Sequence, residues 1–297
     1  MIEATFKTFL RVIGGDKPIG DITKADCRAF KESMVSAYRK AATINKHLHF
    51  LDHLFRWAKG QGFVADSVVN PIAELRIAKS IQKKEALKRL AFTREERETL
   101  IAHPSFQRQR DRSRHPERYW IVLLCLYAGL RREEAAQLLV SQVVHDAVSD
   151  VWYFDISDQG EGQSLKNAAS KRRVPLHADL TARLGFLDYV DRTKTVGHTR
   201  LFYQCAWSAN GWGDATGKWF GRLVRGTLKF PPSLVLHSFR HGFITGLHSA
   251  GVPDALVYAL CGHTGAGGEV HAMYTHRESF PLKVLSEAVN KLDFGLV

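Results

Sequence analysis

The sequence predicts a mainly α-helical protein with a small antiparallel β-sheet, divided into an all-α first domain and a mixed α+β second domain. The first observation behind this prediction is length, because 297 residues are enough for two separate hydrophobic cores. The second is that apolar residues recur at helical spacing, with capping residues, over residues 1–77. The third is a change of period over residues 151–176, where two short strand-like runs flank a polar loop. We expect the second domain at 92–297, after a basic linker at 78–91.

Four helices are predicted in the first domain. The run "EATFKTFLRVI" is apolar at helical spacing, and "ITKADCRAFKESMVSAYRK" opens with Thr23 as an N-cap and Asp26 three residues later, close to a capping box. The run "TINKHLHFLDHLFRWAKGQG" carries one apolar stripe and ends in Gly60 and Gly62, which are C-cap signals. A short fourth helix is predicted in "VVNPIAELRIA", with Pro71 in its first turn.

The linker and the second domain follow from similar signals. The run "KSIQKKEALKRL" contains five Lys or Arg and no core pattern, as expected of a linker with a cationic face. Thr93 then caps a helix whose first turn carries Glu95 and Glu96, as the helix dipole favours. A buried helix is expected over 119–129, with strands at "VWYFDIS" and "RRVPL". Further helices are expected after the second strand, interrupted by a loop at 207–216.

The charge of the chain indicates a polyanionic partner. Forty-two Lys and Arg against thirty Asp and Glu give a net charge of +12. Residues 1–90 hold 17 basic and nine acidic residues, a net +8, so the first domain is the more basic part per residue. Neutralising phosphates with such charges releases counterions and gives salt-sensitive affinity. A basic protein without a nucleic-acid partner is the less favoured interpretation.

Composition also bears on the compartment. The sequence holds no run of 18 apolar residues and no signal-peptide pattern in "MIEATFKTFLRVIGG". Its four cysteines have no paired spacing, and three of them lie in apolar surroundings, which favours reduced, buried thiols. We expect a cytoplasmic protein without a membrane partner.

Four stretches carry residues suited to phosphate chemistry. The first, "AGLRREEAAQL", places Arg131 at a helix junction with Glu134 three residues later, where a guanidinium needs a paired anion. The second, "SLKNAASKRRVPLH", is the loop between the predicted strands. The third and fourth are "LHSFRHGFITGLHSAG" and "LCGHTGAGGEVHAMYTH". The side chains of interest in the second, third and fourth stretches are Lys166, Lys171, Arg172, Arg173, His237, Arg240, His241, His263 and Tyr274.

Taken together and in this order, after a basic helical domain, these stretches resemble the tyrosine recombinase (phage integrase) family. The first domain is similar to that family's core-binding, SAM-like DNA-binding domain, and residues 92–297 to its catalytic domain. The resemblance implies site-specific DNA recombination, in the integration or excision of a mobile element, through a covalent 3′-phosphotyrosyl intermediate. It implies no metal, no ATP and no other cofactor.

The chemistry of phosphodiester cleavage distributes the roles among these residues. Arg131 and Arg240 suit the positive charge that a developing phosphorane needs, because two guanidinium forks can hold both non-bridging oxygens. The family resemblance makes Tyr274 the nucleophile and Lys166 the acid that protonates the leaving 5′-oxygen. It makes His237 an acid/base candidate and His263 a hydrogen-bond donor to the phosphate. Glu134 is expected to orient the pocket.

The predicted partner is duplex DNA with specific recombination sites, bound by four protomers on two sites and by a monomer or weak oligomer otherwise. In a bacterial or phage setting this implies a nucleoid-associated protein. The side chains expected to follow the phosphates are Lys40, Lys46, Lys79, Lys83, Lys84, Arg172 and Arg173. The C-terminal run "FPLKVLSEAVNKLDFGLV" resembles the family's tail helix, whose apolar face docks either on a neighbouring protomer or in cis.

Several alternatives stay open at this level. His237 and His241 have the i, i+4 spacing of a zinc pair, although Arg240 between them would repel a cation. Lys171 rivals Lys166 as the general acid. A catalytically inactive DNA-binding relative, or type IB topoisomerase-like DNA relaxation, would share most of these features.

Overall fold

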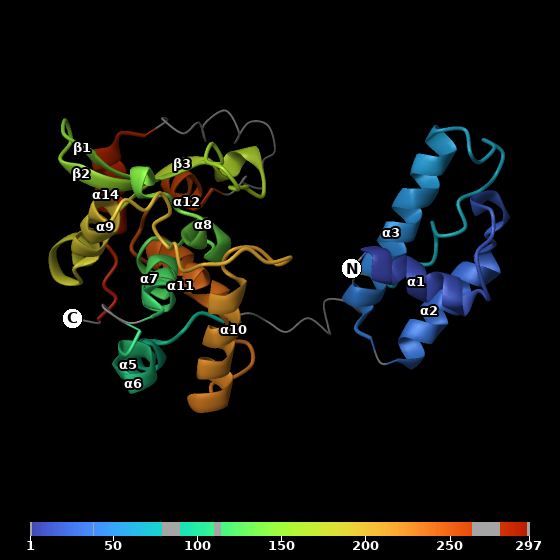
Figure 1. Cartoon of the computed structure of the whole chain (residues 1–297), viewed down its shortest axis with the longest axis horizontal. Helices are drawn as coiled ribbons and strands as arrows, with labels where there is room; N and C mark the ends of the chain where they lie inside the picture. Colours follow the sequence, from blue (N-terminus) through green and yellow to red (C-terminus); the bar gives the residue numbers. More distant parts are fainter. Residues whose placement is uncertain (1, 38, 79–89, 110–113, 263–279, 296–297) are drawn as a thin grey trace. The chain divides into compact units, whose positions relative to one another are not determined.

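The computed structural model describes residues 2–37, 39–78, 90–109, 114–262 and 280–295. The chain forms two compact units, Met1–Lys88 and Arg89–Val297, which are described separately (Figure 1). The division between them falls inside the segment predicted as a linker. No helix in the described part of the chain is long and apolar enough to span a bilayer.

The first unit is built from helices α1 (Ile2–Val12), α2 (Lys24–Ser36) and α3 (Ala41–Gly60), with a 3-10 turn at Ile19–Asp21. The predicted capping box at the start of α2 is confirmed. The backbone N–H of Asp26 donates to Thr23 Oγ1 (3.2 Å), and the N–H of Thr23 donates to Asp26 Oδ2 (2.8 Å). The core combines apolar side chains from all three helices, such as Phe9, Phe30 and Phe55, with others from the segment after α3, such as Ile72 and Leu75.

The predicted fourth helix is wrong. Residues 71–74 form turns and 75–78 are irregular. The backbone of Ile77 instead pairs with the side chain of Asn45 on α3, whose Nδ2 donates to Ile77 O and whose Oδ1 accepts from Ile77 N, both at 2.8 Å. These bonds hold Ile77 against α3. So short a segment has too few internal hydrogen bonds to form a helix without tertiary support.

The second unit surrounds the helix α7 (Pro116–Tyr127). Every residue from Trp120 to Tyr127 is buried, which confirms the predicted buried helix. The helices around it are α5 (Arg94–Ala102), α6 (Pro104–Gln107), α8 (Arg132–Ala136), α9 (Phe186–Thr195), α10 (Asp214–Arg222), α11 (His237–Ser249), α12 (Asp254–Cys261) and α14 (Leu282–Val289). The Thr93 cap of α5 is also confirmed, because Thr93 Oγ1 accepts from Glu96 N at 3.2 Å.

A three-stranded antiparallel sheet lies at one side of this unit, with strand order β1 (Val143–Asp146), β2 (Val151–Ile156) and β3 (Arg172–Pro175) (Figure 1). The pairs Phe154–Val174 and Ile156–Arg172 fix the register of β2 and β3. The strands β2 and β3 were predicted from the sequence, whereas β1 was not. The helices α12 and α14 pack against β3. The apolar face of α14 is therefore buried in cis, through Leu282, Leu285, Ala288 and Val289.

All four cysteines are buried and free, including the one that the sequence did not place in apolar surroundings. Burial raises the pKa of the Cys27 thiol to about 11 and those of Cys125 and Cys205 to about 12. Burial likewise raises the pKa of Cys261. Such thiols stay protonated at neutral pH.

Gly129 makes the turn that leads from α7 to Arg131. Its φ is +59°, in the left-handed region that side chains disfavour. A Cβ on this residue would lie 2.4 Å from Cδ1 of the buried Phe243 on α11. Both the backbone conformation and the close approach of α11 therefore require glycine here.

Gly129→Ala is expected to lower the free energy of unfolding by about 1–2 kcal/mol for the backbone and by about 1–3 kcal/mol more for the contact with Phe243. Gly197→Ala is the matched control, since Gly197 has a φ of +86° and a Cβ added to it would have no atom within 4 Å. Thermal unfolding of the two variants measures the difference. Equal destabilisation would show that Phe243 does not constrain this turn.

Candidate active site

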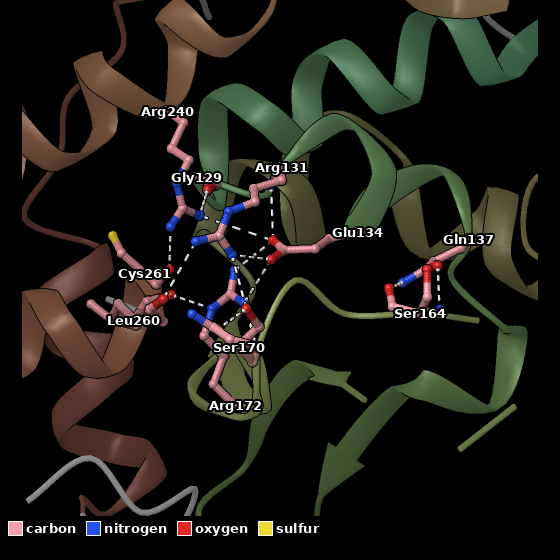
Figure 2. A network of polar contacts seen from close by, with 12 residues as sticks. Gly129, Arg131, Glu134, Gln137, Ser164, Ser170, Arg172, Arg240, Leu260 and Cys261 are labelled. Atoms are coloured by element: carbon pink, nitrogen blue, oxygen red, sulfur yellow. Dashed lines mark hydrogen bonds and ion pairs between the residues drawn. The ribbon is translucent and has the colours of Figure 1, made fainter. Parts of the chain in front are cut away.

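Three arginines from distant parts of the chain converge on one carboxylate, that of Glu134 (Figure 2). Arg131 is the N-cap of α8, Arg172 opens β3, and Arg240 lies in the first turns of α11. Glu134 itself is the third residue of α8. The second unit thus brings three separate chain segments to a single anion.

The contacts to Glu134 use both of its oxygens. Arg131 donates its backbone N–H to Oε2 (2.9 Å) and its Nη1 to Oε1. Arg172 donates Nη2 to Oε2 at 2.9 Å and Nη1 to Oε1 at 3.3 Å, a two-pronged ion pair. Arg240 Nη1 lies 3.9 Å from Oε2. Glu134 is therefore the shared anionic partner of all three arginines.

The charges of this cluster do not balance. Burial would raise the pKa of Glu134, but Arg172, Arg131 and Arg240 together lower it to about 2. The carboxylate is thus ionised at neutral pH. Burial, and then repulsion from Arg172, lower the pKa of Arg240 to about 10, so this guanidinium stays charged at neutral pH. Three cations facing one anion leave an excess of two positive charges, which an additional anion would stabilise.

Backbone carbonyls supply further acceptors. Arg240 donates Nη1 to Gly129 O (2.6 Å) and Nη2 to Cys261 O, while Arg172 Nε donates to Leu260 O (2.7 Å). Cys261 and Leu260 form the C-terminal end of α12, where the helix dipole favours cations. The side chains of the two arginines thereby fix the end of this helix.

Gly262 ends α12 with a φ of +60°. A Cβ there would lie 2.9 Å from Ala169 O, so the close approach of the β2–β3 connection requires glycine. The carbonyl of Gly262 accepts from Arg131 Nη2 at 3.4 Å. The predicted site residue that follows, His263, lies outside the described residues, as does Tyr274.

The arginines differ in access to solvent. The side chains of Arg240 and Arg172 are 1% and 3% exposed, whereas that of Arg131 is 21% exposed. Arg131 lines an open cleft of about 450 Å³ together with the exposed His237 at the start of α11. Arg132, Arg225 and Glu133 also line it, so three arginines face one carboxylate there. The cleft is therefore basic and gives an anion access to Arg131.

The two histidines of α11 lie side by side. The ring centroids of His237 and His241 are 4.9 Å apart and the rings nearly perpendicular, at 85°. Within the described residues, no three or more His, Cys, Asp or Glu side chains are grouped so as to hold a metal ion.

The two candidate lysines occupy the connection between β2 and β3. Lys166 is exposed, two residues before a 3-10 turn at Ala168–Ser170. Lys171 Nζ forms an ion pair with Asp158 Oδ1 at 2.8 Å. The contact with Asp158 holds Lys171 against the base of the hairpin.

The expectation that Arg172 contacts DNA is corrected by its position. Its side chain is buried and serves Glu134 and the end of α12. The sequence contains a signal for this, because strand alternation places Arg172 on the same face as the buried Val174. Arg173, on the opposite face, is half-buried and donates Nη2 to Phe280 O at 3.4 Å.

The remaining residues expected to contact DNA divide between the described and the undescribed parts of the chain. Lys40, the N-cap of α3, and Lys46 on that helix are both exposed. Lys79, Lys83 and Lys84 lie outside the described residues.

Solved structures of DNA-bound integrases share this architecture. The Tn1549 transposon integrase in complex with circular intermediate DNA is 19% identical over 96% of this chain and 92% of that chain, with a TM-score of 0.61. Its complex with transposon right end DNA matches at 18% identity over 94% and 89%, with a TM-score of 0.60. A lambda integrase (75–356) dimer bound to a COC′ core site matches at 17% identity over 93% and 87%, with a TM-score of 0.58.

These matches show that the chain has the tyrosine recombinase fold, and they confirm the predicted fold class. No family model and no curated protein matches the sequence.

Replacing Glu134 with Gln is expected to destabilise the second unit, because the amide leaves three arginines without their anion. The folded-state pKa of about 2 lies below the ordinary value of 4.5, so the carboxylate stabilises the fold above pH 4.5. The size of that contribution is roughly 3 kcal/mol. It is lost as the pH falls from 4.5 towards 2. Thermal unfolding should be measured from pH 7 to pH 2. The difference in Tm between the wild type and Glu134→Gln should disappear as the pH falls from 4.5 towards 2.

Glu98→Gln provides the control, since Glu98 is an exposed carboxylate in an ion pair with Arg94 on α5. Its effect should be about 0.5 kcal/mol or less at neutral pH. A Glu134→Gln variant as stable as the control would show that the arginines do not depend on this carboxylate.

Proposed function

We propose that the protein is a site-specific DNA recombinase that cleaves and rejoins duplex DNA through a covalent 3′-phosphotyrosyl intermediate, in the integration or excision of a mobile element. The observation that carries the proposal is the arginine cluster on Glu134, with its excess of positive charge and its access to a cleft at Arg131. The fold shared with DNA-bound integrases supports the same conclusion.

The proposed reaction needs neither metal nor ATP. The phenolic oxygen of Tyr274 attacks the scissile phosphorus, and the bond from phosphorus to the 5′-oxygen breaks. Arg131 and Arg240 stabilise the charge on the non-bridging oxygens in the transition state. Lys166 gives the 5′-oxygen its proton, His237 accepts the proton that the phenol of Tyr274 loses, and His263 donates a hydrogen bond to the phosphate. Attack by a second 5′-hydroxyl on the phosphotyrosine restores the phosphodiester, so its bond energy is conserved.

The proposed substrate is duplex DNA with two recombination sites, each occupied by two protomers. Lys40 and Lys46 on the first unit are exposed and suited to phosphate contacts. The basic segment that contains Lys79, Lys83 and Lys84 would add to them. The protein would act in the bacterial cytoplasm, on nucleoid DNA.

The covalent intermediate provides the most direct test. The protein is incubated with sheared DNA of its source genome and denatured with detergent, and the DNA that stays attached is sequenced. A duplex of the recovered site, nicked beside the cleavage position, should then trap a covalent adduct with the wild type. Tyr274→Phe should form none. An adduct that survives this substitution contradicts the assignment of the nucleophile.

The same site separates recombination from simple relaxation. A recombinase should exchange strands between two copies of the recovered site and depend on both. Relaxation of supercoiled DNA that needs only one site, without exchange, would contradict the proposal in favour of a topoisomerase.

The exposed lysines of the first unit should set part of the salt dependence of DNA binding. Lys40→Gln with Lys46→Gln is expected to flatten the slope of log K against log salt by roughly 0.9 for each phosphate that the variant no longer neutralises. Lys7→Gln with Lys24→Gln is the matched control, because these lysines are paired with Glu3 and Glu74 in the same unit. Titrations on one duplex at several salt concentrations measure both slopes. Equal slopes for the two double variants would show that Lys40 and Lys46 do not contact the DNA phosphates.

A further inference from the structure

A buried glutamine forms hydrogen bonds with the backbone of the loop that carries Lys166. Gln137 is the C-cap of α8 and only 2% exposed. Its Nε2 donates to the carbonyl of Ser164 (2.8 Å), and its Oε1 accepts from the N–H of the same residue (3.0 Å), as Figure 2 shows. One side chain thereby satisfies both backbone groups of a residue two positions before Lys166.

This pairing fixes the loop more firmly than a single hydrogen bond would. The two bonds run in opposite directions, so the amide can neither rotate nor exchange its ends without losing both. Gln163 strengthens the arrangement, because its Nε2 donates to Gln137 O and to Gln142 Oε1, both at 2.8 Å. The buried Gln142 in turn donates to Ser157 Oγ at 2.9 Å. The first half of the loop is therefore tied to the segment that follows α8.

The loop is held on the other side of Lys166 as well. The fully buried Ser170 accepts from Arg131 Nη1 at 3.3 Å and donates its hydroxyl to Asn167 Oδ1 at 2.8 Å. Leu165 packs against the hydrophobic core. Exposed Lys166 thus lies between two anchors, Gln137 and Arg131, that flank the same short helix.

We propose that Gln137 is a positioning residue for Lys166. It fixes the backbone just before Lys166 relative to Arg131, so that the ammonium group meets the leaving 5′-oxygen of a phosphate bound at Arg131. This inference rests on the proposed function. Gln137 acts only through Lys166 and does not touch the DNA.

A sulfur-substituted substrate separates this role from general stability. When sulfur replaces the bridging 5′-oxygen at the cleavage position, the phosphorus–sulfur bond breaks and a thiolate leaves. A thiol has a pKa near 8.5, far below that of an alcohol, so this leaving group needs no proton from Lys166. Cleavage of the sulfur substrate therefore reports on the arginines and the nucleophile alone.

Gln137→Ala is expected to slow single-turnover cleavage of the ordinary site duplex roughly 10- to 100-fold, as displacement of a catalytic group by about 1 Å does. Cleavage of the sulfur duplex should stay within about threefold of wild type, since no proton transfer is required. Lys166→Ala should show the same pattern with a larger loss on the ordinary duplex, roughly 10²- to 10⁴-fold. Arg240→Ala should be slow on both.

Two further variants keep the test decisive. Gln137→Glu keeps the size of the side chain but loses the N–H donor to Ser164, and it should reproduce the selective loss even if the alanine variant folds poorly. Tyr189→Phe removes a different buried hydrogen bond of the second unit, the one to Leu201 O (3.0 Å). Tyr189→Phe should leave the ratio of the cleavage rates on the ordinary and the sulfur duplex unchanged.

The outcomes distinguish the two proposals. If the wild type cleaves both duplexes and the Gln137 variants are equally slow on both, Gln137 is structural and its positioning role is refuted. If the wild type forms no adduct with either duplex, the proposed function itself fails and this inference falls with it. A selective loss on the ordinary duplex supports both.

Discussion

The carboxylate of Glu134 is the anion on which the arrangement of the second unit depends. Each guanidinium that reaches it comes from a different segment, and a buried cation without such a partner would cost several kcal/mol. The carbonyls of Gly129, Leu260 and Cys261 complete the hydrogen bonding of Arg172 and Arg240. Because the carboxylate compensates for only one of the three charges, the fold itself maintains an affinity for anions.

The four consecutive charged residues Arg131–Glu134, at the start of the short helix α8, all contact other segments of the second unit. Arg132 Nη2 donates to Asn210 O at 3.2 Å. Glu133 accepts from the backbone N–H groups of Trp212 and Gly213, just before α10 begins, so its charge lies at the positive end of that helix. A helix of five residues has too few internal hydrogen bonds to persist alone. These tertiary contacts stabilise α8, and each of them also positions a neighbouring element.

The sequence predicted the parts of this structure that depend on local chemistry. The caps at Thr23 and Thr93, the buried helix α7 and the strands β2 and β3 all follow from spacing within about twenty residues. The gathering of Arg131 and Arg240 at one site followed only from the family resemblance, because their segments are far apart in the chain.

The features that escaped prediction depend on partners distant in sequence. The irregular course of residues 75–78 depends on Asn45, and the burial of Arg172 depends on Glu134 and the end of α12. The four residues of β1 form a strand because they pair with the backbone of β2. The pairing of Gln137 with Ser164 spans 27 positions and has no local signature.

The burial of the cysteines has a practical consequence for observing the protein at work. All four thiols are enclosed and remain protonated at neutral pH, so maleimides and similar thiolate-directed reagents find little to attack in the folded chain. A single cysteine introduced on either unit would therefore accept a fluorophore selectively in an otherwise native sequence. Energy transfer between one such dye and labelled DNA could then follow the two units separately during a single encounter.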